Sequence, residues 1–174
     1  ESAYLPEIAL GMHDISGTGL FSGEYLVGSK RTGPLDWSLG LGWGYAGGRA
    51  NLRNPLSLFS KSFDTRTSNA GQGGNFNPGS YFHGPTALFG GVQYQTPWAP
   101  LILKLEYDGN NYQHEPQSNN QLQSSPWNVG LVYRLGRAMD LTFGLERGNT
   151  VMLGLTLQTQ LDGLAMPKLS DPPR

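Results

Sequence analysis

Strict alternation between large apolar residues and small or polar ones is the feature that most constrains this chain. The clearest run is 35–45, LDWSLGLGWGY, in which every odd position holds Leu, Trp or Tyr and every even position holds Asp, Ser or Gly. Successive side chains of a β-strand point to opposite faces, so this period of two predicts a strand with one apolar face. The segments 100–108, 126–135, 139–146 and 150–160 repeat the pattern.

Weaker alternation marks three more segments, 6–13, 19–30 and 86–96. In 19–30 we assign Phe21, Tyr25 and Val27 to the apolar face, opposite Ser22 and Glu24. The predicted fold is therefore all-β and antiparallel, with about eight strands within 1–160, at 6–13, 19–30, 35–45, 86–96, 100–108, 126–135, 139–146 and 150–160.

The connections between these segments alternate in length. Those at 31–34, 97–100 and 136–138 are short, whereas 46–85 and 109–126 are long and rich in Asn, Gly, Gln, Ser and Pro. Short turns at one end and long loops at the other are typical of bacterial outer-membrane barrels. We therefore expect an antiparallel transmembrane β-barrel, or part of a larger one, followed by a Pro-containing tail or linker at 161–174.

Composition narrows the class of protein. A chain of 174 residues suits one domain, and the absence of cysteine excludes disulfides, thiolate zinc sites and a cysteine nucleophile. The net charge is −1 and no basic run is longer than Lys30-Arg31, so nucleic acid is not an expected partner. No run of 18 apolar residues is present, which excludes a transmembrane helix but not a transmembrane barrel.

The direction of the apolar face has two interpretations. In a soluble barrel it would point inward, but the interior of eight strands is only wide enough for side chains of mixed size, and a row such as Leu35, Trp37 and Leu39 would overfill it. If the same row faces lipid instead, its aliphatic residues mid-strand suit the hydrocarbon core and its aromatic residues near the strand ends suit the headgroup region. The residues that suit such aromatic girdles are Trp37, Trp43, Tyr45, Tyr107, Trp127 and Tyr133. We therefore expect the cell outer membrane of a Gram-negative bacterium, with outer-membrane lipid as a partner.

The opposite face would then line the lumen. Its charged residues are Lys104, Glu106, Asp108, Arg134, Asp140 and Glu146, which either pair across neighbouring strands or line a ligand path. Gly40, Gly42 and Gly44 remove side chains from one wall, which leaves room for either a partner segment or a groove.

Catalysis is not expected. His13 and Asp14 are neighbours on a strand and point to opposite faces, and neither His83 nor His114 has a second ligand at metal spacing. No cofactor motif is present, so we expect no cofactor. Two alternatives stay open: an outer-membrane lipid- or glycan-modifying enzyme, and a structural scaffold or adhesion barrel.

The long loop 46–85 combines aromatic rings with Arg and Asn side chains. Sugar rings stack on aromatic faces and sugar hydroxyls bond to amides and guanidinium groups, although the same aromatics could instead form a small core of the loop. Long ordered loops are usually functional. The candidate polysaccharide-contacting residues are Arg49, Arg53, Phe76, Tyr81 and Phe82 in the loop and Lys104, Glu106 and Arg134 on the lumen face.

One stretch resembles a known family. Residues 5–27, LPEIALGMHDISGTGLFSGEYLV, followed by Ser29-Lys30-Arg31, look like the YjbH family of exopolysaccharide-associated outer-membrane proteins; 39–45 and 71–76 continue the likeness. The resemblance implies a non-enzymatic β-barrel component of exopolysaccharide secretion. Its implied partners are exopolysaccharide and other export components. Because an eight-stranded barrel is filled by its own side chains, we also expect further strands or a second barrel, from the same protein or from other export components.

The chain departs from that family in two ways. Family members are typically much longer lipoproteins, and this chain has neither their length nor a cysteine. We interpret 161–174 as a linker in a longer protein. We also expect strand 6–13 or strand 150–160 to pair with a strand outside this segment, because an unpaired edge in lipid leaves backbone groups unsatisfied.

Overall fold

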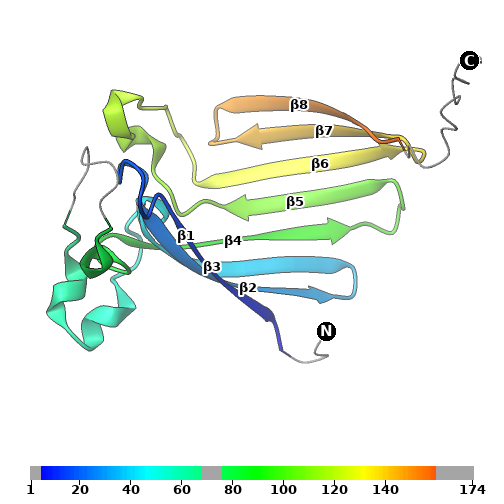
Figure 1. Cartoon of the computed structure of the whole chain (residues 1–174). Helices are drawn as coiled ribbons and strands as arrows, with labels where there is room; N and C mark the ends of the chain where they lie inside the picture. The colour runs from blue at the N-terminus through cyan, green and yellow to red at the C-terminus, as the bar shows by residue number, and fades with distance from the viewer. Residues whose placement is uncertain (1–4, 68–75, 160–174) are drawn as a thin grey trace, which may run out of the picture.

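The computed structural model describes residues 5–67 and 76–159. They form one eight-stranded antiparallel sheet in which each strand pairs with the next along the chain (Figure 1). The strands are β1 Glu7–His13, β2 Gly23–Thr32, β3 Leu35–Gly44, β4 Thr86–Gln95, β5 Leu101–Tyr107, β6 Trp127–Leu135, β7 Met139–Glu146 and β8 Thr150–Leu157. The expectation of an all-β, antiparallel, eight-stranded fold is confirmed. The predicted tail 161–174 and the stretch 71–75 lie outside the described residues.

The long connections contain short 3-10 turns. Between β3 and β4 these are η1 Tyr45–Gly47, η2 Pro55–Leu58, η3 Lys61–Asp64 and η4 Pro78–Ser80; between β5 and β6 they are η5 Tyr112–His114 and η6 Pro116–Ser118. In the part of the chain that the structure describes, no helix is long and apolar enough to cross a membrane.

The sheet is open. β1 and β8 are its two edges, and among the described residues they do not pair with each other. Closure into a barrel by this segment alone, one form of the expected fold, is therefore wrong. A barrel closes only when tilt and curvature bring the last strand back to the first, and Figure 1 shows β1 and β8 on opposite sides of the sheet.

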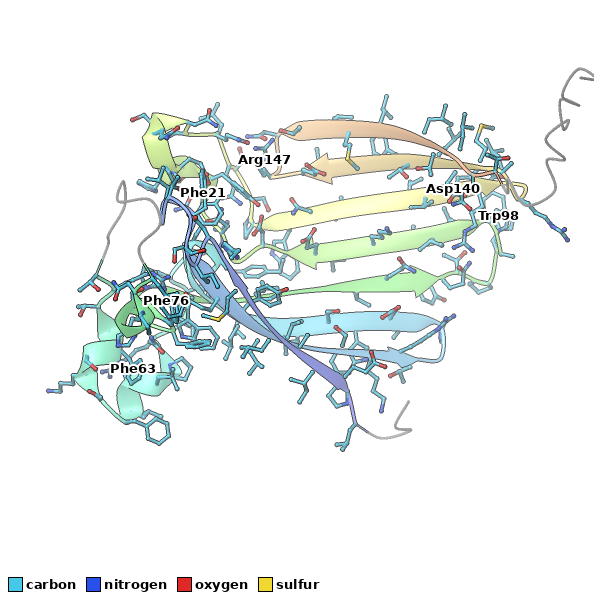
Figure 2. All side chains as sticks on the ribbon, viewed as in Figure 1. Phe21, Phe63, Phe76, Trp98, Asp140 and Arg147 are labelled. Atoms are coloured by element: carbon cyan, nitrogen blue, oxygen red, sulfur yellow. The ribbon has the colours of Figure 1, made fainter. Side chains whose placement is uncertain are left out.

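The connections divide the sheet into two ends. The short turns join β2 to β3, β4 to β5 and β6 to β7 at one end, where β1 also begins and β8 also ends (Figure 1). The turn glycines Gly33 and Gly136 have φ of 57° and 71°, a left-handed backbone conformation that glycine adopts more readily than residues with a Cβ. The long connections meet at the opposite end, where Phe21, Phe63, Phe76 and Arg147 lie in Figure 2, far from Trp98 and Asp140.

Cross-strand register gathers the large apolar side chains on one face, which we call the apolar face. Leu26 pairs with Leu41 and Leu41 with Leu88, while Leu131 pairs with both Leu103 and Phe143. This face has aromatic pairs at both ends. Tyr107 and Trp127 contact each other at the loop end, with ring centroids 4.9 Å apart, and Trp98 and Tyr133 do so at the turn end, at 5.2 Å.

The face assignment within β2 was wrong. Because Leu26 is opposite Leu10 and Leu41, it lies on the apolar face, and Tyr25 and Val27 lie on the other. β2 also starts at Gly23 and not at residue 19. The preceding residues form a turn closed by Asp14, whose carboxylate accepts a hydrogen bond from the Phe21 N–H at 3.0 Å.

The opposite face, which we call the glycine face, is filled beside Gly40 and Gly42 of β3. The rings of Tyr25 on β2 and Phe89 on β4 meet edge to face at 6.4 Å across β3. A Cβ at Gly40 would lie 2.4 Å from the Phe89 ring, and one at Gly42 would lie 2.5 Å from the Ala46 carbonyl oxygen. Of the two possibilities for the glycine row, the structure therefore has a partner segment, η1 together with these rings.

Candidate functional site at the loop end of the sheet

An ion pair fastens the long β3–β4 connection to the sheet. Glu24, at the start of β2, is fully buried, and its two carboxylate oxygens accept hydrogen bonds from the two terminal nitrogens of Arg66, both at 2.9 Å. The Phe82 N–H donates a third bond at 2.9 Å, and Arg66 also reaches the Ser22 hydroxyl at 2.6 Å. Bidentate arginine–carboxylate pairs of this kind fix geometry as well as charge. Residues 66 and 82 are thereby held against the start of β2.

A second set of contacts, formed by Trp43 and Asn54, lies beside this ion pair. Trp43 is only 5% exposed, and its indole N–H donates to the Asn54 side-chain oxygen at 3.1 Å. The Asn54 amide nitrogen donates in turn to the carbonyls of Phe63 and Phe82, each at 2.8 Å. The Phe82 ring packs edge to face on Trp43, with centroids 5.3 Å apart. Trp43 therefore belongs to the core under the loop, and its predicted place in an aromatic girdle was wrong.

On the glycine face, η1 is tied to the β5–β6 connection. The Tyr45 hydroxyl donates to the Glu115 carboxylate at 2.8 Å, and Arg49 donates to the carbonyls of Asp108 and Asn110, both at 2.9 Å. Burial, reinforced by the hydrogen bond to Glu115, raises the pKa of Tyr45 to about 12. Tyr45 thus holds two loops together and is not part of an aromatic girdle, another difference from the prediction.

A cleft of about 280 Å³ lies between three connections at this end. Its walls are the β1–β2 turn, the part of the β3–β4 connection that includes Arg66 and Tyr81, and the part of the β5–β6 connection that includes Asn111 and His114. The ion pair and the Tyr45–Glu115 bond fix these walls.

The five predicted loop residues have different environments. Arg49 joins two connections, whereas Arg53 forms an exposed ion pair with Asp64 at 3.2 Å. Phe82 lies in the loop core. Tyr81 lines the cleft, and Phe76, which is 64% exposed, contacts its ring edge to face at 5.7 Å. Only Tyr81 of this set therefore lines the cleft.

The three predicted lumen residues share the glycine face. Lys104 and Glu106 alternate with Leu103 and Leu105 on β5, and Arg134 is directly opposite Asp140 across β6 and β7. Within the described residues, none of the predicted lumen charges forms an ion pair within 4.0 Å. Glu106 also lines a hollow of about 170 Å³ beside the rings of Tyr25 and Phe89. Of the two possibilities for these charges, cross-strand ion pairing is therefore not seen among the described residues.

The three histidines do not converge. The His13 ring contacts Tyr45 edge to face at 6.2 Å, whereas His83 stacks on Phe63 at 4.2 Å and its Nδ1 lies 2.7 Å from the Tyr81 carbonyl. His114 lines the cleft. No group of three His, Cys, Asp or Glu side chains that could hold a metal ion occurs in residues 5–67 and 76–159.

The sequence interpretation missed the residues that shape this end of the molecule: Glu24, Asn54, Asn110 and Glu115. Glu24 carried one usable signal, because it interrupts an otherwise apolar face and a buried charge needs a partner. That signal was hidden by the wrong face assignment of β2. Asn54 is followed by Pro55, which is typical of the start of a short helical turn, and its side chain accepts from the Leu56 N–H.

Comparisons with known proteins identify the family. The YjbH family model, described as "Exopolysaccharide biosynthesis protein YbjH", matches residues 1–174. The protein named "Uncharacterized lipoprotein YjbH" of Escherichia coli (strain K12) is 51% identical over 164 residues, which cover 94% of this chain and 23% of that protein. The chain thus spans about a quarter of the length of this curated relative, and neither description indicates a catalytic function. No solved structure matches the chain. The full-length family match, together with this identity, shows that the chain belongs to the YjbH family of exopolysaccharide biosynthesis proteins.

Proposed function

We propose that this chain forms part of the wall of a β-barrel in the outer membrane, within a longer protein that supports exopolysaccharide secretion without catalysing a reaction. The observation that carries the proposal is the exposed apolar face, which extends over all eight strands. The alternative of a lipid- or glycan-modifying enzyme has no converging catalytic groups among the described residues to support it.

The apolar face is too extensive to be exposed to water. Leu10 is 62% exposed, Val129 46% and Leu153 78%, on strands at both edges and in the middle of the sheet. Soluble monomers rarely expose continuous apolar patches of more than a few hundred Å². Contact with lipid suits a face of this extent, because lipid chains adapt to its shape.

The aromatic pairs support the same orientation. Tyr107 and Trp127 lie at the loop end and Trp98 and Tyr133 at the turn end, with Val129 and Leu131 between them on β6. From Trp127 to Tyr133 is roughly 20 Å along the strand, at about 3.4 Å per residue. Rings with polar edges at both limits of an aliphatic band are typical of proteins that face a bilayer.

The open edges support membership in a larger wall. In lipid, each unsatisfied backbone group costs several kcal/mol, so β1 and β8 would need further strands beside them. We infer that these strands come from elsewhere in the same protein, from a second barrel or from other export components. The curated relative is long enough to supply them, since this chain covers 23% of it.

The link to the polymer rests on the family and on the glycine face. Lys104, Glu106 and Arg134 would line the interior of the wall, where a hydrated polymer could contact them. An eight-stranded barrel is filled by its own side chains, so a conduit would need the additional strands.

Neighbouring cysteine substitutions on β5 and β6 test the orientation in the full-length protein. Leu105→Cys and Leu131→Cys should react with a probe dissolved in the lipid phase, whereas Lys104→Cys and Gly130→Cys should react with a water-soluble maleimide. A Cβ at Gly130 has no neighbour closer than 3.4 Å, so the cysteine fits. Water-phase labelling at 105 and 131 would exclude the lipid-facing assignment.

A further inference from the structure

The cleft at the loop end has the size of a small ligand site. Its volume of about 280 Å³ is close to the lower limit of roughly 300 Å³ for pockets that hold small molecules. Segments far apart in the sequence form it, since Asp14, Tyr81 and His114 come from three different connections. A site of this size suits a short segment of a polymer, one or two units long.

Hydrogen bonds hold the walls in place before any ligand arrives. The Tyr81 hydroxyl donates to the Ile15 carbonyl at 3.3 Å, which joins the β3–β4 connection to the β1–β2 turn. The Tyr45–Glu115 bond joins η1 to the β5–β6 connection, and Arg66 is fixed by Glu24. Walls that are already ordered lose little conformational entropy on binding, which favours affinity.

Polar side chains of the lining supply hydrogen-bonding groups. Asn77 and His114 both line the cleft, and the imidazole of His114 approaches Asn111 through Nδ1 at 3.4 Å, which leaves Nε2 for a ligand. The ring of Tyr81 adds an apolar surface, and Phe76 packs against it. Amides, an imidazole and an aromatic ring together can bind the hydroxyls and the apolar face of a sugar.

The charges of the cleft favour a neutral ligand. The Arg66 guanidinium lines the cleft, but it is already paired through two hydrogen bonds with the buried Glu24 carboxylate. The Asp14 carboxylate also lines the cleft, and hydrogen bonding from the Phe21 N–H lowers its pKa, so it is anionic at neutral pH. A polyanionic ligand would therefore meet a carboxylate and no free guanidinium.

We propose that this cleft binds a neutral saccharide segment of the exopolysaccharide, with Tyr81 as the stacking surface and Asn77 and His114 as hydrogen-bonding groups. The inference rests on the proposed role in secretion and adds the place of contact and the class of sugar. The cleft lies at the end with the long loops, which in outer-membrane barrels is the outer end.

Photo-crosslinking in cells that produce the polymer tests the site with its natural ligand. A benzophenone-bearing phenylalanine analogue is placed at position 20 or 116 of the full-length protein, because Leu20 and Pro116 line the cleft without being among the proposed binding groups. The controls carry it at Phe59 or Leu122, which are 85% and 83% exposed outside the cleft. After illumination, polymer should be attached at 20 and 116 and absent at 59 and 122. Tyr81→Ala should abolish the attachment at 116, whereas Tyr81→Phe, which keeps the ring, should retain it.

Three outcomes would overturn the proposal: no polymer at 20 and 116 in a correctly inserted protein, equal labelling at the control positions, or a uronic acid or phosphorylated sugar at the crosslink by mass spectrometry. Insertion is checked by the cysteine labelling of β5 and β6. If that labelling shows Leu105 and Leu131 in lipid while the cleft captures no polymer, the cleft assignment fails and the barrel proposal stands. Water-phase labelling at these positions overturns the barrel proposal instead.

Discussion

Removal of the Arg66 guanidinium should loosen the β3–β4 connection while the sheet stays intact. In Arg66→Ala, the fully buried Glu24 carboxylate loses its two arginine donors and, among the described residues, keeps the Phe82 N–H as its donor. Removing one partner of a buried ion pair typically costs about 3–5 kcal/mol, because the remaining charge is buried without compensation. The lost free energy should favour local opening of the loop, since the ion pair joins the loop to the start of β2.

Hydrogen exchange of the full-length protein in detergent micelles measures this opening. At about 1.36 kcal/mol per factor of ten, exchange of peptides that span residues 78–84 should accelerate by roughly a hundredfold to several thousandfold. Peptides from β6 should keep the protection of the wild type. The matched control is Arg53→Ala, which removes the exposed pair with Asp64 and should leave exchange unchanged because solvent already screens that pair.

A double substitution separates charge burial from simple loss of packing. Glu24→Gln combined with Arg66→Met removes both charges and should restore most of the protection, because a neutral pair leaves no uncompensated charge. The reasoning is refuted if Arg66→Ala exchanges within a factor of about three of the wild type, well below the effect expected from a buried ion pair. It is also refuted if the double variant is as unprotected as the single one.

Three further predictions test other parts of the structure. Leu131→Arg should destabilise the protein in lipid vesicles by about 2–4 kcal/mol if position 131 lies near the midplane, as measured by urea unfolding, and a negligible change would contradict lipid exposure there. His13→Gln combined with His83→Gln should leave exopolysaccharide secretion close to the wild type, and a severe loss from a correctly inserted protein would revive a catalytic role. Tyr45→Phe should remove one tyrosine that ionises near pH 12 in absorbance titration at the phenolate band. Because the pKa of Tyr45 is raised above the ordinary value of 10.0, its stabilising effect should be present below pH 10 and be lost between pH 10 and pH 12; the loss of a tyrosine that ionises near pH 10 would contradict this.

Alternation in the sequence was sufficient to predict most of the sheet. In β3 one face is large and the other is small or polar, and in β5 and β6 only Ile102 and Val132 depart from this pattern, so a period of two specifies both the strand and its faces. The tight turns at Gly33 and Gly136 then keep neighbours in the chain together as neighbours in the sheet. β2 failed because Tyr25, Leu26 and Val27 are consecutive large residues, which fit either face equally well. Pairing of Leu26 with Leu41 decides the face, and that information lies in the partner strand.

The candidate site depended on contacts that no local pattern encodes. Glu24 and Arg66 are 42 positions apart, and Tyr45 and Glu115 are 70 apart, so each pair forms only after the intervening loops have folded back. The same folding buries Trp43 and half-buries Tyr45, whose residue types alone suit a membrane girdle. The open edges of the sheet are also a tertiary property, since strand count does not fix curvature. Local periodicity thus specifies strands and faces because it acts between near neighbours, whereas the loop paths and the curvature depend on long-range contacts and emerge only in the folded sheet.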